Sequence, residues 1–112
     1  MSTRRWQDDG QVFTEAKPKQ KTKRPPLYKV LLHNDDFTTM EFVVAVLRAI
    51  FHMSETDATA VMLKIHRSGI GVAGVYTREI AETKVTEVTQ AAEQAEFPLL
   101  CTMEPEESAG DE

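Results

Sequence analysis

A short apolar run that gives way to helical spacing is the feature that most constrains the fold. Residues 27–33 form an apolar, β-prone run, which predicts a strand. Across residues 39–51 the apolar positions recur every three or four residues, which predicts an amphipathic helix. The strand must therefore end and the helix begin at one corner. The residues between them, 34–38, are polar apart from Phe37.

Three polar residues in succession, Asn34, Asp35 and Asp36, occupy that corner. We interpret Thr38 with Glu41 as a capping box, in which the hydroxyl accepts a bond from a backbone N–H and the glutamate reaches back. Neither aspartate is then needed as the cap. Asn and Asp also favour plain turns, which would explain one or two of these residues. Three together at a rigid corner suit an ammonium group, a hydroxyl or a metal.

The rest of the chain predicts two more helices and two more strands. Ser54 begins a second helix that ends at Gly69, a good residue just past a helix. Residues 70–76 alternate glycine with β-branched residues and predict a strand that something approaches closely on one side. Thr77 begins a third helix, and the last strand is expected at 99–103. The order β-α-α-β-α-β predicts a small α+β sandwich, with three helices packed on a three-stranded sheet.

Charge and composition divide the chain into three parts. Residues 1–26 are polar and aperiodic, and we predict a disordered arm there. Residues 27–104 form one core domain, and 105–112 form an acidic disordered tail. Seven Lys/Arg face three Asp/Glu up to residue 24, whereas the rest of the chain carries six against fifteen. An acidic body with a basic arm is poorly suited to gripping a nucleic-acid backbone.

The surroundings of the protein follow from what the sequence lacks. There is no apolar run of about 18 residues, so no membrane span is predicted. No secretory signal is visible at the N-terminus, and the single cysteine, Cys101, excludes an intramolecular disulfide. A cytoplasmic protein is the economical interpretation.

An apolar cavity with a polar mouth is predicted between the first two helices. Met40 lies one turn from the acidic corner, and Met62 and Ile65 share a helix face with His66. Methionine is flexible and polarisable, so it lines sites that accept several apolar shapes. Any one of these residues is most often plain core. His66 is either a surface histidine or a hydrogen-bond partner at the mouth.

Metal and catalytic sites have weaker support. The residues that a metal would draw on are His33, Asp35, Asp36, His52 and His66. No two of these histidines lie four apart on a helix, and there is no HExxH frame. No nucleophile stands beside a base, because Ser54 and Ser68 resemble cap and turn residues and Cys101 sits in a strand. A hydrolase using the paired carboxylates is therefore disfavoured.

Five separate motifs, in order and spacing, carry a family resemblance. They are Asn34 to Asp36 with Thr38 and Met40 to Val43; Met62 with Ile65 and His66; residues 74–77; residues 81–85; and residues 97–99. Together they are similar to the ClpS family, adaptors for the ClpA-type AAA+ unfoldase and the ClpP protease. The resemblance covers residues 26–104. It implies a monomeric, non-enzymatic adaptor without a cofactor that binds N-degron substrates beginning with Leu, Phe, Tyr or Trp.

The resemblance also implies roles for individual residues. Asn34, Asp36 and His66 would hydrogen-bond the substrate's free α-amino group, and Asp35 would contact the backbone that follows. The side-chain pocket would be lined by Thr38, Met40, Val43, Met62, Ile65 and Leu99. Docking on the N-terminal domain of the unfoldase would use Glu79, Glu82 and Lys84, on a charged helix face that is otherwise interpreted as solvated.

Three positions depart from the family pattern. Thr39 replaces a common proline at the helix start, which we expect to cost only some rigidity. His33 replaces a usual apolar residue near the depth of the pocket, and Ile65 replaces a common valine. We expect both to narrow or polarise the pocket. The alternative hypothesis is a protein–protein module that modulates the unfoldase without binding N-termini.

Overall fold

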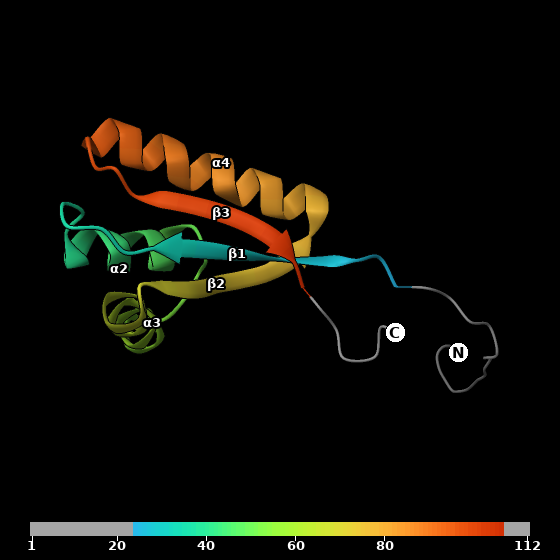
Figure 1. The fold of residues 1–112 in the computed structure, drawn as a ribbon, viewed down its shortest axis with the longest axis horizontal. Helices are drawn as coiled ribbons and strands as arrows, with labels where there is room; N and C mark the ends of the chain where they lie inside the picture. The colour runs from blue at the N-terminus through green and yellow to red at the C-terminus, as the bar shows by residue number, and fades with distance from the viewer. Residues whose placement is uncertain (1–23, 107–112) are drawn as a thin grey trace, which may run out of the picture.

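Three strands and three helices make up most of residues 24–106, which are the part of the chain described by the computed structural model (Figure 1). Their order is β1 (Leu27–His33), α2 (Met40–Ala49), α3 (Glu55–Ser68), β2 (Ile70–Thr77), α4 (Arg78–Ala95) and β3 (Leu100–Pro105). The predicted fold class and element order are confirmed. Most of the predicted arm 1–26 and tail 105–112 lies outside the described residues, so these boundaries stay predictions.

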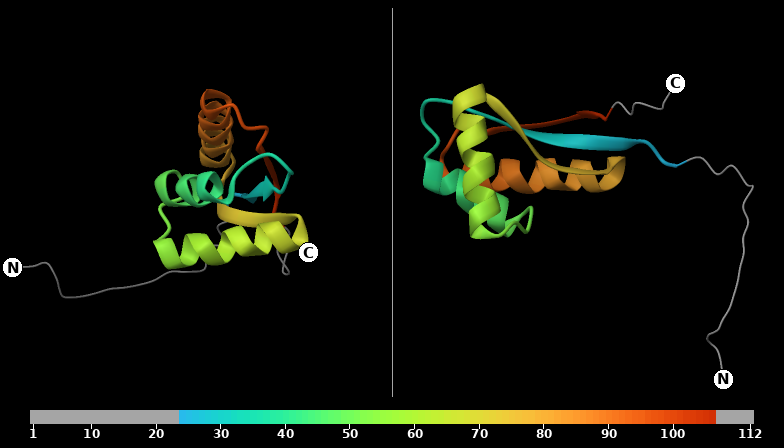
Figure 2. Two further views of the ribbon diagram at one scale, coloured as in Figure 1. Left: turned by 90° about the vertical axis from the view of Figure 1, so that its left-hand side faces the viewer. Right: turned by 90° about the horizontal axis from the view of Figure 1, so that it is seen from below.

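The sheet is antiparallel, with β1 as its central strand in the order β2-β1-β3. Val30 and Leu32 of this central strand are completely buried. The helices gather on the side of the sheet to which these two residues point (Figure 2). The pairing of β1 with β2 shifts register between Val30 and Leu31, and a bulge of this kind increases the local twist of a sheet.

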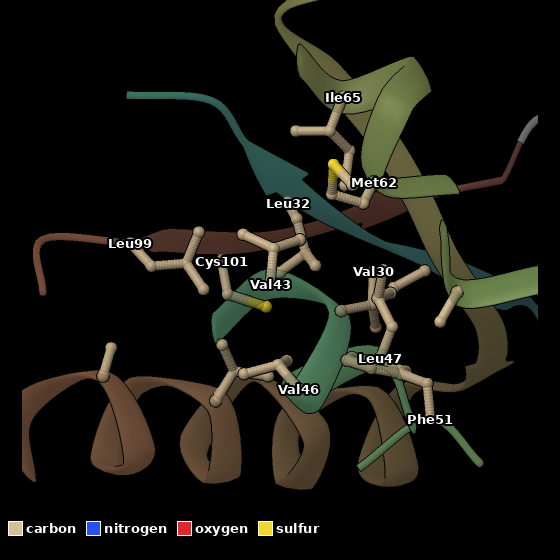
Figure 3. Close-up of a cluster of buried hydrophobic side chains, with 14 of the residues drawn as sticks. Val30, Leu32, Val43, Val46, Leu47, Phe51, Met62, Ile65, Leu99 and Cys101 are labelled. Carbon is tan, nitrogen blue, oxygen red and sulfur yellow. The ribbon is translucent and has the colours of Figure 1, made fainter. Parts of the chain in front are cut away.

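The core fills the space between the sheet and the helices. Val43, Val46 and Leu47 of α2 point into it, and Met62 and Ile65 of α3 enter from the other side (Figure 3). Burying a side chain of this size contributes roughly 1.5–3 kcal/mol. The same cluster therefore holds the first two helices together and fixes their distance from β1.

The ends of α3 follow the sequence signals. The Ser54 hydroxyl accepts a hydrogen bond from the backbone N–H of Asp57 at 3.1 Å, and Gly69 ends the helix with a φ of 90°. Glycine adopts this left-handed conformation without steric cost. The first helix, expected over 39–51, is shorter and ends at Ala49.

Lys84 joins α4 to the end of α2. Its ammonium donates a hydrogen bond to the Ile50 carbonyl at 2.8 Å, and it lies 6.0 Å from the centroid of the Phe51 ring and 5.7 Å from that of Tyr76. The cation thus satisfies an orphan carbonyl at the negative end of a helix. The sequence left open whether this charged face of α4 is solvated or a docking surface, and the structure shows that Lys84 on this face is half-buried.

Replacing Lys84 by methionine keeps an unbranched apolar stem but leaves the Ile50 carbonyl without its donor. We expect Lys84→Met to lower the free energy of unfolding by about 1–3 kcal/mol, and each 1 kcal/mol shifts the melting temperature by about 4–8 °C in a domain of this size. Thermal denaturation followed by circular dichroism measures this shift.

The matched control is Arg78→Ala, which breaks the exposed Arg78–Glu82 pair (3.3 Å). Exposed pairs contribute at most about 1 kcal/mol, so this variant should melt close to the wild type. Equal melting temperatures for Lys84→Met and the wild type would contradict a structural role for Lys84.

Candidate functional site

The site is built where the end of β1 meets the end of α3. The backbone N–H of Asn34 donates a hydrogen bond to the Gly69 carbonyl at 2.9 Å, and His33 pairs with Ile70 in the sheet. The residue after β1 is thereby fixed beside the last turn of α3, which carries His66. These two backbone contacts bring Asn34 and His66, which are far apart in the sequence, to the same corner.

Asp35 holds the corner in shape. Its Oδ1 accepts hydrogen bonds from the backbone N–H groups of Phe37 (2.8 Å) and Thr38 (2.7 Å), and its Oδ2 accepts one from the Thr38 hydroxyl (2.8 Å). Partial burial by itself raises the pKa of Asp35, but these three donors outweigh it and hold the pKa below the ordinary 3.8. The charged form of Asp35 is therefore a structural part of the loop.

The N-cap of α2 is Thr39 and not Thr38, which was the predicted N-cap. Thr39 has extended backbone angles, and its hydroxyl accepts a hydrogen bond from the Phe42 N–H at 3.1 Å. The predicted capping box of Thr38 and Glu41 is wrong, because the Thr38 hydroxyl is engaged by Asp35. Neither aspartate is the cap, but the inference that both are left available for something else is wrong for Asp35, since its carboxylate shapes the turn before the cap.

A hollow of about 210 Å³ opens beside this corner. This volume lies below the roughly 300–1,000 Å³ of pockets for drug-sized ligands, so it suits a single side chain. Its lining combines polar groups from the corner with apolar groups from α2 and α3: Asn34, Asp35, Asp36, Thr38, Met40, Val43, Met62, Ile65 and His66. The predicted apolar cavity with a polar mouth is present between the first two helices.

Two residues assigned to the pocket lie elsewhere. Leu99 is buried in the core just before β3 and is not part of the lining. His33 is also outside the lining, and its Nε2 lies 2.8 Å from the Thr102 hydroxyl on β3. The expectation that His33 polarises the pocket is therefore wrong, whereas Ile65 does form part of the wall.

Gly71 on β2 makes room for Ile65. A Cβ atom built on Gly71 would lie 2.6 Å from Cγ1 of Ile65, so any larger residue would force one of the two to shift. The glycine-rich pattern predicted a close approach on one side of this strand, and that prediction is confirmed. The sequence did not indicate that the approaching side chain is a pocket residue.

Three polar side chains at the mouth remain free. Within residues 24–106, Asn34, Asp36 and His66 make no side-chain hydrogen bond, in contrast to Asp35. They offer an amide oxygen, a carboxylate and an imidazole nitrogen as acceptors. Among the described residues no group of three potential ligands could hold a metal, and no helix there is long and apolar enough to cross a membrane.

The residues assigned to docking lie on α4, across the molecule from α3 (Figures 1 and 2). Glu79 and Glu82 are exposed, and Glu82 pairs with Arg78. Lys84 is half-buried through its bond to Ile50. The docking candidates and the hollow therefore belong to different surfaces.

Comparison with known proteins decides the family. Residues 23–102 match the family model described as "ATP-dependent Clp protease adaptor protein ClpS". The chain belongs to the ClpS family. A ClpS from Myxococcus xanthus is 62% identical, covering 88% of this chain and 92% of the relative. A second, from Desulfatibacillum aliphaticivorans, is 58% identical over 89% of this chain and 94% of the relative. A ClpS is an adaptor of the Clp protease and not an enzyme.

A solved ClpS structure has the same fold. It is Agrobacterium tumefaciens ClpS2 bound to L-phenylalaninamide, with a TM-score of 0.72 and 53% identity over 74% of this chain and 100% of that one. The predicted sandwich is thus the fold of a ClpS protein.

Asp35→Ala should loosen the corner, because three backbone and side-chain donors lose their acceptor. We expect the variant to unfold at a lower temperature by an amount equivalent to about 1–3 kcal/mol. The matched change Asp36→Ala should leave stability near that of the wild type. Thermal denaturation of both variants at neutral pH measures the difference.

The contribution of Asp35 to the stability of the fold should also decrease as the pH falls. Since its folded-state pKa lies below 3.8, its contribution is present above that value and is lost as the pH falls through the lowered one. The wild type and Asp35→Ala should therefore converge in acid. A difference that is absent at neutral pH, or grows in acid, would contradict this assignment.

Proposed function

We propose that this ClpS protein binds the first residue of N-degron substrates, Leu, Phe, Tyr or Trp, and delivers them to the Clp unfoldase–protease. The observation that carries the proposal is a side-chain-sized hollow with apolar walls, at whose mouth three polar side chains make no hydrogen bond within residues 24–106. Asn34, Asp36 and His66 would take the α-amino group. Met40, Val43, Met62 and Ile65 would surround the side chain.

The chemistry of a chain terminus fits this mouth. An α-amino group has a pKa of about 7.7–8.0, so it is mostly cationic at neutral pH. An ammonium has three donors and no acceptor, which matches a mouth that offers acceptors. Its bond to the Asp36 carboxylate would be charge-assisted and therefore strong. An internal residue has no such cation, so it cannot supply the charged donor that pairs with these exposed acceptors.

The apolar walls supply the second half of the recognition. Enclosing a Leu or Phe side chain contributes roughly 1.5–3 kcal/mol, and two of the wall residues are methionines, which adapt to different shapes. The ligand of the similar ClpS2, L-phenylalaninamide, combines a free α-amino group with a phenyl side chain. That combination is the one we propose for this pocket.

We also propose that α4 docks on the N-terminal domain of a ClpA-type unfoldase. Its first turns carry the exposed carboxylates of Glu79 and Glu82, which suit a partner surface with complementary charge. The ammonium of Lys84 has three donors, of which one is used by Ile50. The cytoplasmic location stays a prediction.

The proposal is tested with two peptides that differ only at the terminus. Fluorescence anisotropy should show that a Phe-initiated peptide with a free amine binds at least about tenfold more tightly than its N-acetylated copy, a difference of about 1.4 kcal/mol. Asp36→Ala should weaken the free-amine peptide and reduce this ratio. The same variant should still bind the unfoldase's N-terminal domain, since Asp36 lies outside α4.

Equal binding of the free and acetylated peptides by the wild type would remove N-terminal recognition. Binding of the unfoldase domain with no peptide binding would then favour the alternative, a module that modulates the unfoldase without binding N-termini.

A further inference from the structure

Phe37 is the most exposed large apolar side chain among residues 24–106, with 75% of its surface open to solvent. It stands between Asp36 and Thr38, both of which line the hollow, but it is not itself part of the lining. Single apolar residues on a surface are common and need no explanation. Exposure alone therefore assigns no role to Phe37.

The backbone that carries Phe37 is unusually well held. The Phe37 N–H donates to Asp35 Oδ1 at 2.8 Å, and both the N–H and the hydroxyl of Thr38 bond to the same carboxylate. The ring is thus presented from a loop with a fixed shape. A pre-organised aromatic side chain contributes contact area at low cost in conformational entropy, because only two torsions need to be fixed.

An apolar residue of the pocket wall lies near Phe37 in the chain and is itself partly exposed. Met40 lines the hollow and is still 43% exposed, so part of it faces the mouth. Phe37 lies three residues before Met40, which begins α2. Two exposed apolar side chains, those of Phe37 and Met40, therefore flank the lining residue Thr38 along the chain.

We propose that Phe37 is a specificity-determining residue for the second residue of the bound chain, and that it favours a large apolar or aromatic side chain there. The proposal rests on the binding of a first residue in the hollow. Consecutive Cα atoms are about 3.8 Å apart, so the second residue leaves the pocket directly at the mouth. Its side chain then lies within reach of a ring that projects from the segment between Asp36 and Thr38.

The experiment compares peptides that share a first Phe and differ only in the second residue, Ala, Leu or Phe. The wild type should bind the Phe-Phe peptide about two- to tenfold more tightly than the Phe-Ala peptide, the range expected for an aromatic pair. Phe37→Ala should lose this preference while its affinity for the Phe-Ala peptide stays within about twofold. The hydrogen bonds at this position come from the backbone, so the variant keeps them.

The matched control is Ile80→Ala, which removes another exposed apolar side chain (49%) from α4. It should keep the wild-type preference. A preference that survives in Phe37→Ala, or that is absent from the wild type, overturns the proposal, and so does an equal loss of affinity for all three peptides.

The acetylated copy of the Phe-Ala peptide separates this failure from that of the proposed function. If the free-amine peptide binds more tightly than the acetylated one but the second residue has no effect, only the role of Phe37 is overturned. If the two bind equally, the pocket does not read N-termini, and both proposals fail together.

Discussion

The backbone hydrogen bond from Asn34 to the Gly69 carbonyl is the contact on which the site depends. It ties the end of the central strand to the end of α3, and the left-handed conformation of Gly69 brings the chain into β2 beside it. Without this closure, the corner that follows β1 and the histidine in the last turn of α3 would have no fixed relation. The sheet and the core set the distance between α2 and α3. The Asn34–Gly69 bond fixes the position of the polar corner after β1 relative to the end of α3.

The two aspartates at the corner differ in what engages them. The carboxylate of Asp35 accepts hydrogen bonds from the loop. These bonds favour its charged form and lower its pKa. Asp36, one residue later, has no such partner among the described residues and is left for a ligand. A rigid loop that leaves one charge unengaged is the arrangement that pre-organised recognition requires, since little reorganisation is needed when the ligand arrives.

Much of the fold could be predicted from the sequence because local signals agree with the global structure. The strand at 27–33 has the predicted bounds, and Ser54 and Gly69 mark the ends of α3 as their chemistry suggests. The pocket walls were also predictable, since Met62, Ile65 and His66 share a helix face. The family resemblance supplied the roles of individual residues, which spacing alone left open.

The errors come from contacts that local sequence does not encode. By residue type, Thr38 and Thr39 are equally good N-caps. The Thr38 hydroxyl is bonded to Asp35, so Thr39 caps the helix. Lys84 lies 34 residues from the carbonyl that it caps, a distance that no periodicity reveals. His33 was expected near the pocket. Side chains of a strand alternate between the two faces of the sheet, and the side chain of His33 lies on the face where it contacts Thr102.

The most direct measurement concerns the protonation of the bound terminus. A Phe-initiated peptide labelled with ¹⁵N at its α-amino group can be titrated by NMR, free and saturated with the protein. Because Asp36 favours the cation, the amine should have a pKa in the complex above its free value of about 7.7–8.0. The affinity should then fall as the pH rises above the free value. An amine pKa that is unchanged or lowered on binding would contradict a pocket that grips a positive chain terminus.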